Sequence, residues 1–274
     1  MTRNLLNAGY EVVVYNRSPN KAEEMKVHGA IVAASVEEVA RRSDIVVLSL
    51  PSPEAVTTVA LGKGGLVDGL AKGSVIIDTS TIDPAVAMKI ASELKAKGCY
   101  FLDSPVSGGP EGAAAGTLTI MVGGDASAFE KSGHVLRTIG KSIFYLGESG
   151  SGQKMKLANQ ALVGVYFVAI AEAYRWSIRM GVREEDLLRV ISTSWGDSPV
   201  FRHFMSVVKS GRYEDGASIK LMKKDLSIVL GISEKENIPM SLAKLSQGCF
   251  LKADELGYGD FDMSFIHKAL ESYD

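Results

Sequence analysis

The stretch Gly147-Glu-Ser-Gly-Ser-Gly-Gln-Lys-Met-Lys156-Leu-Ala-Asn159-Gln160 marks the point at which the character of the chain changes. Its glycines allow backbone angles that other residues avoid, and a long apolar segment, residues 157–176, follows directly. Lys156, Asn159 and Gln160 have the spacing i, i+3 and i+4, which places their side chains on one face of a helix. A lysine beside two amides on an otherwise apolar helix suits the binding of a small polar substrate. The alternative is a core lysine that extends its ammonium to solvent.

The sequence before this stretch alternates short apolar strands with amphipathic helices. Helices with clear end signals are predicted at residues 2–8, 19–28, 35–42 and 83–98, and the third opens with a capping box from Ser35 to Glu38. Near-continuous apolar strands such as residues 45–48 are typical of a parallel sheet that is covered on both faces. Residues 1–147 are therefore predicted to form a doubly wound α/β domain, with strands at residues 11–15, 31–33, 44–50, 74–78, 100–103, 118–122 and 142–146.

Helical periodicity dominates the sequence after residue 147. Helices are predicted near residues 152–180, 184–194, 199–209, 218–236, 239–257 and 262–272, and no strand is predicted. Residues 148–274 are therefore predicted to form an all-helical domain, which the long helix through Lys156 joins to the first domain.

The composition is that of a soluble globular protein of 274 residues, with 46% hydrophobic residues, 23% charged residues and a net charge of −2. No long basic block is present, so nucleic acid is not an expected partner. Two cysteines are too few for a disulfide framework, which predicts a reducing, cytoplasmic setting. The apolar segment 157–176 is almost long enough to span a membrane, but it contains Asn159, Gln160, Glu172 and Arg175, so a buried helix is predicted and no membrane partner is expected.

The beginning of the sequence differs from that of a complete dinucleotide-binding fold. Such a fold starts with a strand, a glycine-rich turn and a helix whose N-terminus receives the pyrophosphate. Residues 2–8 read as that first helix, and no Gly-x-Gly-x-x-Gly precedes them. We therefore expect the first strand and the glycine loop to be absent from the sequence, and the sheet to be split where the first strand normally lies. A shortened expression form, a misassigned start codon and a naturally short chain all remain open.

Loops at the predicted strand ends supply candidate cofactor contacts. Asn16-Arg17-Ser18 follows the second strand of the expected fold, where an arginine suits a 2′-phosphate and a carboxylate would suit a free 2′-hydroxyl. This sequence favours NADP over NAD, although an ordinary turn with an exposed arginine is the alternative. Leu50-Pro51 and Thr81 lie in loops that follow two further strands, and each loop can also be read as a plain helix N-cap.

Ser107-Gly108-Gly109 combines a hydroxyl with backbone N–H groups that no side chain covers. Such a concave arrangement of N–H groups suits a carboxylate. The alternative is a flexible loop of small residues.

Several of these motifs, in this order, resemble the β-hydroxyacid dehydrogenases, the family of 3-hydroxyisobutyrate dehydrogenase and its semialdehyde-reductase relatives. The resemblance starts from Asp103-Ser-Pro-Val-Ser-Gly-Gly109, which is followed in the sequence by Gly116-Thr-Leu and Met121-Val-Gly-Gly124. It continues with Gly150-Ser-Gly-Gln, which precedes Lys156 and Asn159. Asp78-Thr-Ser-Thr81, Lys223-Lys-Asp-Leu226 and Gly257-Tyr-Gly-Asp-Phe-Asp262 match further patterns of the family. The resemblance covers essentially the whole chain and implies a Rossmann-like domain, a helical domain for substrate binding and oligomerisation, and an active site between them.

The resemblance also implies roles for individual residues. It makes Lys156 the catalytic residue. No metal site is predicted. The substrate-binding residues it implies are Ser107, Gly108, Gly109, Asn159, Gln160 and Asp225. The cofactor-binding residues it implies are Asn16, Arg17, Ser18, Leu50, Pro51, Thr81 and Lys224. Gln160 departs from the family pattern, because many relatives carry a second asparagine there.

The predicted function is that of an NADP-dependent oxidoreductase that interconverts a short semialdehyde or keto acid and the corresponding hydroxy acid. A lysine with its ordinary pKa of about 10.4 is protonated near neutral pH, as proton donation during reduction requires. The expected partners are a small-molecule carboxylate substrate and further copies of the chain in a homodimer or homotetramer. The alternative is a truncated homologue that binds cofactor poorly or not at all and acts as a structural, oligomeric protein. An imine reductase is disfavoured because those relatives typically lack the lysine.

Overall fold

In the first part of the chain, the strands form from short apolar runs, and small and polar residues follow these runs. The computed structural model describes residues 1–214 and 216–273 and divides the chain into two compact units, Met1–Lys156 and Leu157–Asp274. The division falls inside helix α9 (Ser151–Arg179), whereas the sequence predicts it after residue 147.

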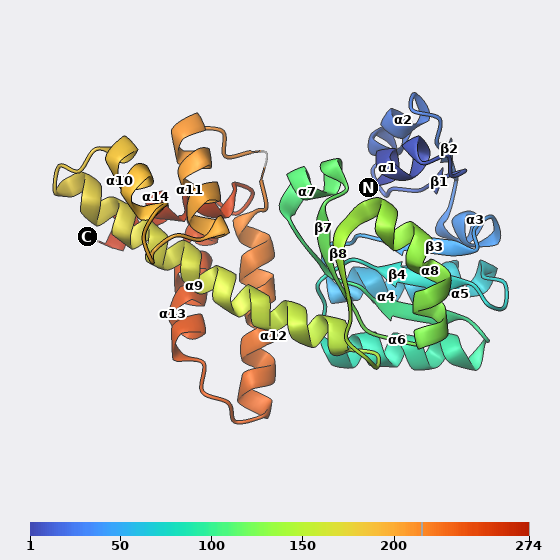
Figure 1. Cartoon of the computed structure of the whole chain (residues 1–274). Coiled ribbons are helices and arrows are strands. Elements are labelled where there is room, and N and C mark those ends of the chain that lie inside the picture. The colour runs from blue at the N-terminus through green and yellow to red at the C-terminus, as the bar shows by residue number, and fades with distance from the viewer. Residues whose placement is uncertain (215, 274) are drawn as a thin grey trace. The chain divides into compact units, whose positions relative to one another are not determined.

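Parallel strands form the centre of the first unit. β3 (Ile45–Leu48), β4 (Val75–Asp78) and β5 (Tyr100–Asp103) pair in order, and the last residues of the three strands, Leu48, Asp78 and Asp103, are in register. All residues of β4 are buried, as expected of a middle strand. β1 (Val13–Val14) and β2 (Ile31–Val32) form a separate parallel pair (Figure 1). The predicted split between these two groups of strands is therefore present in the described residues.

A third group of strands contains an antiparallel pair that was not predicted. β6 (Val106–Ser107) runs antiparallel to β7 (Leu118–Val122), which pairs in parallel with β8 (Gly140–Tyr145). The short connection from β6 to β7 through α7 (Gly109–Ala115) explains the direction, because a parallel crossover needs about a dozen residues or more. An isolated bridge between Asp103 and Gly123 links the ends of β5 and β7.

Several helices of the first unit begin at residues whose side chains cap the helix. Ser35 accepts a hydrogen bond from the Glu38 N–H, so the predicted cap at Ser35 is confirmed. The Glu38 carboxylate accepts from the N–H of Ala34, one residue before the N-cap of a standard capping box. Asp83 caps the helix that starts at Pro84, because its Oδ1 accepts a hydrogen bond from the Ala85 N–H. Besides α7, the helices of the first unit are α1 (Thr2–Asn7), α2 (Pro19–Lys26), α3 (Val36–Arg41), α4 (Pro53–Leu61), α5 (Leu66–Gly69), α6 (Pro84–Ala96) and α8 (Ala126–Ile139).

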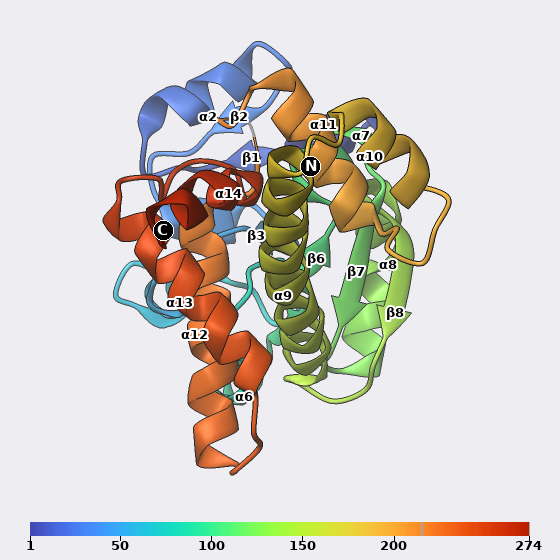
Figure 2. The ribbon, with the colours of Figure 1, turned by 90° about the vertical axis from the view of Figure 1, so that its left-hand side faces the viewer.

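The second unit is helical and packs around its own aromatic core, which contains Phe167, Phe204 and Phe250. α12 (Ile219–Lys235) and α13 (Ser241–Glu255) lie side by side (Figures 1 and 2). α10 (Glu184–Ile191) and α11 (Pro199–Ser210) follow α9 in the chain. The single helix predicted at 262–272 is instead three short pieces, η1 (Met263–Phe265), α14 (Ile266–Ala269) and η2 (Leu270–Tyr273). Asp262 caps the first of them.

The long helix α9 keeps part of its apolar surface exposed. In the described part of the chain it is the one helix that is long and apolar enough, by length and composition, to cross a membrane, a test that core helices of soluble proteins also pass. Leu162 and Trp176 on this helix are 56% and 64% exposed. The sequence predicts a buried helix, but within one copy of the chain α9 is only partly buried.

Candidate active site

Asp103 fastens the start of α9 to the end of strand β5. Its side chain is completely buried, and the carboxylate accepts hydrogen bonds from the backbone N–H groups of Gly150 (2.7 Å) and Gln153 (3.0 Å). These N–H groups lie where a helix has no partners of its own, so the carboxylate serves as their cap. Burial raises the pKa of Asp103, and the hydrogen bonds from the helix oppose this effect.

Two glycines allow the first turn of α9 to approach the strands closely. A Cβ at Gly152 would lie 2.3 Å from the carbonyl oxygen of Met121 and 2.5 Å from that of Asp103. A Cβ at Gly123, just after β7, would lie 2.8 Å from the backbone nitrogen of Gly152. Only a residue without a side chain leaves room for this contact.

Gln153 joins α9 to the loop that follows β4. The side chain is fully buried, and its Oε1 accepts from the Ile82 N–H at 3.0 Å while its Nε2 donates to the Ser80 carbonyl at 2.8 Å. The Gln153 side chain therefore hydrogen-bonds to the residues immediately before and after Thr81, a predicted cofactor contact.

The loops after β3 and β4 are also joined to each other. Ser80 Oγ accepts a hydrogen bond from the Leu50 N–H at 2.9 Å, and Thr79 Oγ1 donates to the Leu48 carbonyl at 2.6 Å. Leu50 and its exposed neighbour Pro51, both predicted cofactor contacts, follow β3. The structure thus brings the Leu50 and Thr81 loops together at the carboxyl ends of parallel strands, where such folds bind their ligands.

Lys156 lies on α9, one turn after Gln153. It is buried, with 7% of its surface exposed, so the alternative of an ammonium extended to solvent does not describe this structure. Asn159 and Gln160 follow on the same helix and belong to the second unit. Helical spacing places Asn159 and Gln160 on the side of α9 that carries Lys156, as the sequence predicts.

The predicted substrate residues of the second unit form a connected polar group. Asn159 Nδ2 donates to Gln160 Oε1 at 3.1 Å, and Gln160 Nε2 donates to Asp225 Oδ2 at 2.7 Å. Lys224 Nζ lies 2.9 Å from Asp225 Oδ1, although without hydrogen-bond geometry at that oxygen. Gln160 and Asp225 are both buried. Within this unit, the amide nitrogen of Gln160 therefore already donates its hydrogen bond to Asp225.

The Ser107-Gly108-Gly109 motif lies at the turn from β6 into α7. Gly108 and Gly109 have φ values of +131° and +65°, which explains why glycine is needed at both positions. Ser107 is half-buried, and Gly108 and Gly109 are exposed. The motif is therefore a defined turn that opens onto the surface of its unit.

Asn16, Arg17 and Ser18 are exposed between β1 and α2. Ser18 occupies the N-cap position of α2, but its side chain makes no cap hydrogen bond, unlike Ser35, Ser52 and Ser198 at other helices. The Ser18 hydroxyl is therefore not used by its own helix, and it lies beside an arginine at a helix N-terminus. This combination suits a phosphate group.

Gln153, Asp103 and Ser80 are the polar residues of this region to which the sequence analysis assigned no function. All three residues lie inside the quoted family motifs, and no other feature of the sequence around them indicates a function. Their partners are up to 73 positions away in the chain, so no spacing rule could identify them.

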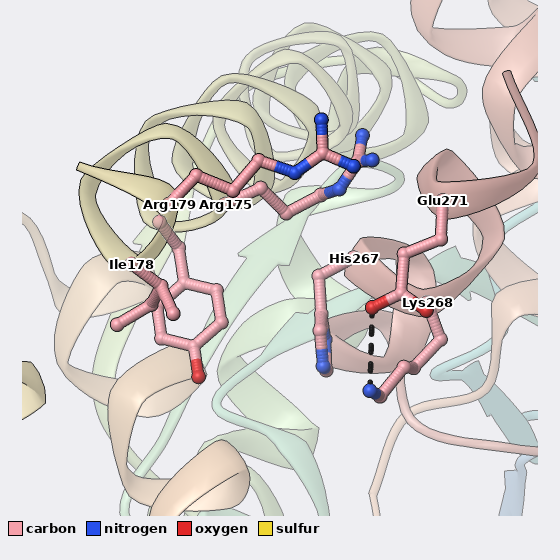
Figure 3. A pocket seen from close by; sticks show the side chains of 7 residues that line it. Arg175, Ile178, Arg179, His267, Lys268 and Glu271 are labelled. Carbon is pink, nitrogen blue, oxygen red and sulfur yellow. Dashed lines mark hydrogen bonds and ion pairs between the residues drawn. The ribbon is translucent and has the colours of Figure 1, made fainter. Parts of the chain in front are cut away.

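A separate pocket of about 210 Å³ lies in the second unit, lined by α9 and by α14 and η2 (Figure 3). Arg175, Arg179, His267 and Lys268 line it, and Lys268 pairs with Glu271. Tyr174 is the first residue of α9 that lines this pocket. At the helical rise per residue, Tyr174 lies about 27 Å along α9 from Lys156. The pocket is therefore distinct from the predicted substrate site.

Comparisons with known proteins identify the two parts of the chain separately. Residues 1–147 match the family described as the NAD binding domain of 6-phosphogluconate dehydrogenase. Residues 150–270 match the family described as NAD-binding of NADP-dependent 3-hydroxyisobutyrate dehydrogenase.

Individual relatives are similar over nearly the whole chain. The chain is 34% identical to 2-(hydroxymethyl)glutarate dehydrogenase of Eubacterium barkeri, over 99% of this chain and 90% of that protein. It is 32% identical to glyoxylate/succinic semialdehyde reductase 1 of Arabidopsis thaliana, over 99% of this chain and 94% of that protein. The crystal structure of 3-hydroxyisobutyrate dehydrogenase from Salmonella typhimurium matches with a TM-score of 0.90 and 30% identity, over 97% of this chain and 94% of that chain.

The fold, the strand-end loops and these matches define a nicotinamide-dependent oxidoreductase with a Rossmann-like first domain and a helical second domain. The chain belongs to the β-hydroxyacid dehydrogenase family, as its sequence motifs predict.

Proposed function

We propose that the chain is an NADP-dependent oxidoreductase that interconverts a short semialdehyde or keto acid and the corresponding hydroxy acid. Lys156 is the general acid and base. The observation that carries the proposal is the burial of this lysine on a helix whose first turn is hydrogen-bonded to the Thr81 loop and to Asp103.

A bound nicotinamide cofactor supplies or takes up the hydride in this reaction. Arg17 and the hydroxyl of Ser18, which makes no cap hydrogen bond to its own helix, fit a 2′-phosphate. This supports NADP over NAD. Asn16 adds a polar side chain at the same turn, and the loops with Leu50, Pro51 and Thr81 would hold the rest of the cofactor. Lys224 is proposed as a further contact.

Lys156 moves the proton. In reduction its ammonium donates a proton to the substrate oxygen, and in oxidation its amine accepts that proton. Asn159 orients the same oxygen, while Ser107 and the N–H groups of Gly108 and Gly109 bind the substrate carboxylate. We propose that Gln160 acts on the substrate through Asp225, because its amide hydrogen-bonds that carboxylate.

The names of the relatives support a short acid substrate. They refer to 2-(hydroxymethyl)glutarate, to glyoxylate and succinic semialdehyde, and to 3-hydroxyisobutyrate. We propose a substrate of this class, an aldehyde or ketone that carries a carboxylate within a few carbons of the reacting carbon.

We also propose that the protein is a cytoplasmic homodimer or homotetramer. The exposed apolar side chains of α9 and α13, among them Leu162, Trp176, Leu242 and Leu245, support association through the helical unit. Light scattering on the native chain and on a Leu162→Glu variant tests this. A wild-type mass equal to one chain would contradict it.

The experiment for the reaction is a panel of short semialdehydes, keto acids and hydroxy acids, each assayed with NADP(H) and NAD(H). We expect turnover with at least one pair and a preference for NADP(H). Lys156→Ala is expected to lower kcat by about 100-fold or more. Lys156→Arg is expected to fail as well, because a guanidinium does not release a proton near neutral pH.

A cofactor titration separates this proposal from the non-catalytic alternative. The fluorescence of Trp176 and Trp195 and the melting temperature report binding of NADPH to the folded chain. Absence of binding at millimolar NADPH would favour a structural, oligomeric protein over an enzyme.

A further inference from the structure

We propose that Gln153 is a positioning residue that sets the placement of Thr81 relative to Lys156. It acts through the backbone of the β4–α6 loop and touches neither substrate nor cofactor. This inference rests on the proposed function of Lys156 and deepens it.

The side-chain amide of Gln153 forms hydrogen bonds on both sides of Thr81. Oε1 accepts from the N–H of the residue after it, Ile82, and Nε2 donates to the carbonyl of the residue before it, Ser80. The orientation of the amide follows from these partners, because an N–H requires an oxygen and a carbonyl requires an N–H. The backbone on either side of Thr81 is therefore fixed to one side chain.

Gln153 lies on the same helix as Lys156, and its backbone is hydrogen-bonded to the end of strand β5. The backbone N–H of Gln153 donates to Asp103, and Lys156 follows three positions later, one helical turn further along α9. Ser80 Oγ also accepts a hydrogen bond from the Leu50 N–H, so the loop after β3 is joined to Gln153 through Ser80. One turn of α9 thus connects the cofactor loops with the proposed proton donor.

This connection has a chemical consequence for the reaction. Hydride and proton reach neighbouring atoms of the substrate, so the cofactor loops and the lysine must hold a common geometry. A misplacement of about 1 Å in such a geometry lowers the rate by roughly 100-fold. A residue that only stabilised the fold would not affect the rate of correctly folded molecules.

The first test is Gln153→Met, which keeps the approximate volume and removes both side-chain hydrogen bonds. We expect kcat per folded molecule to fall about 100-fold, and the Ile82 amide to exchange its hydrogen faster in mass spectrometry. The KM for substrate is expected to change much less, because Ser107, Gly108 and Asn159 are not held by Gln153. Ile139→Val, in the buried core of the same unit, is the matched control that lowers the melting temperature and leaves kcat unchanged.

The second test is Gln153→Glu, measured as the ratio of its kcat to that of the wild type from pH 5.5 to 8.5. A protonated carboxyl can still donate to the Ser80 carbonyl and accept from the Ile82 N–H, whereas a carboxylate cannot donate. Burial raises the pKa of such a carboxyl. We therefore expect a ratio near 1 at low pH that falls up to tenfold per pH unit above that pKa.

Other charged groups near this position are Asp103 on β5, Asp78 at the end of β4, Asp83 at the start of α6 and Lys156 on α9. Asp103 binds the N–H of Gln153, and Asp78 Oδ1 accepts from the Ser80 N–H. These groups are present in both proteins, so the ratio of the two kcat values isolates the titration of residue 153.

The results separate this inference from the proposed function. A wild type without turnover, or a Lys156→Ala variant as active as the wild type, would overturn the proposed function and this inference with it. If both pass, a Gln153→Met variant that matches Ile139→Val in kcat overturns the positioning role alone. A kcat ratio for Gln153→Glu that is already far below 1 at pH 5.5, where the buried carboxyl is protonated, does the same.

Discussion

Gly152→Ala is the change that most directly perturbs the contact between α9 and the strands. The added methyl carbon would lie 2.3 Å from the Met121 carbonyl oxygen and 2.5 Å from the Asp103 carbonyl oxygen, whereas ordinary contact begins at 3.4 Å. Both neighbours are backbone atoms of strands, so no flexible side chain can move aside. The helix itself must shift, by about 1 Å, or the strands must distort.

The expected loss of stability is about 2–8 kcal/mol, the sum of an overpacking cost, a hydrogen-bond cost and a helix-propensity gain. Overpacking of this kind costs about 1–3 kcal/mol. A shift of the helix also weakens the hydrogen bonds from Gly150 and Gln153 to Asp103, and each buried group left unpaired costs about 1–3 kcal/mol. Replacement of glycine by alanine inside a helix returns about 1 kcal/mol. Domains are stable by about 5–15 kcal/mol, so the first unit would lose a large part of its stability.

Urea unfolding with far-UV circular dichroism measures the loss, and kcat of the folded fraction measures the displacement of Lys156. The matched control is Gly231→Ala in α12, where an added Cβ meets nothing within 4 Å. This control is expected to be neutral or more stable by up to about 1 kcal/mol. A Gly152→Ala protein with the wild-type unfolding midpoint and wild-type kcat would refute the close packing of α9 described above.

Further predictions concern the proposed contact of Arg17 with the cofactor and the pH dependence of stability. Arg17→Ala is expected to raise the KM for NADPH about tenfold or more and to leave the KM for NADH nearly unchanged, because a charged hydrogen bond contributes about 1.5–3 kcal/mol. Equal effects on both cofactors in steady-state kinetics would remove Arg17 from recognition of the 2′-phosphate. Burial lowers the pKa of His267 below its ordinary value of 6.5, so the folded state binds its proton less readily than the unfolded state. Stability from this group is therefore complete above pH 6.5 and decreases below it, by at most about 1.4 kcal/mol per pH unit. His267→Gln should reduce the difference between urea unfolding at pH 7.5 and at pH 5.5, and an unchanged difference would show that His267 does not cause it.

The fold was predictable where local pattern determines structure. Tyr100–Asp103 and Leu118–Val122 form strands with the predicted bounds because each is an apolar run that glycines or prolines delimit. The two-residue strand β6 was missed because Val106 and Ser107 lie among prolines and glycines, and only pairing with β7 makes them a strand. The predicted last helix breaks into short pieces where Asp262 caps a single 3₁₀ turn.

The candidate site was predictable only where motifs or helical spacing carried information. Lys156, Asn159 and Gln160 could be placed on one helix from their spacing alone. The contacts of Gln160 with Asp225 and of Gln153 with Ser80 join residues 65 and 73 positions apart, which local patterns do not encode. The function of a buried glutamine depends on those partners, so it became visible only in three dimensions.

The proposed proton transfer by Lys156 is tested most directly by single-turnover hydride transfer in a Lys156→Ala variant that still binds NADPH. Stopped-flow measurement of NADPH oxidation with saturating substrate separates the chemical step from product release. A rate about 100-fold or more below that of the wild type is predicted. A rate within a few-fold of the wild type, with NADPH and substrate fully bound, would contradict the assignment of the proton to this lysine.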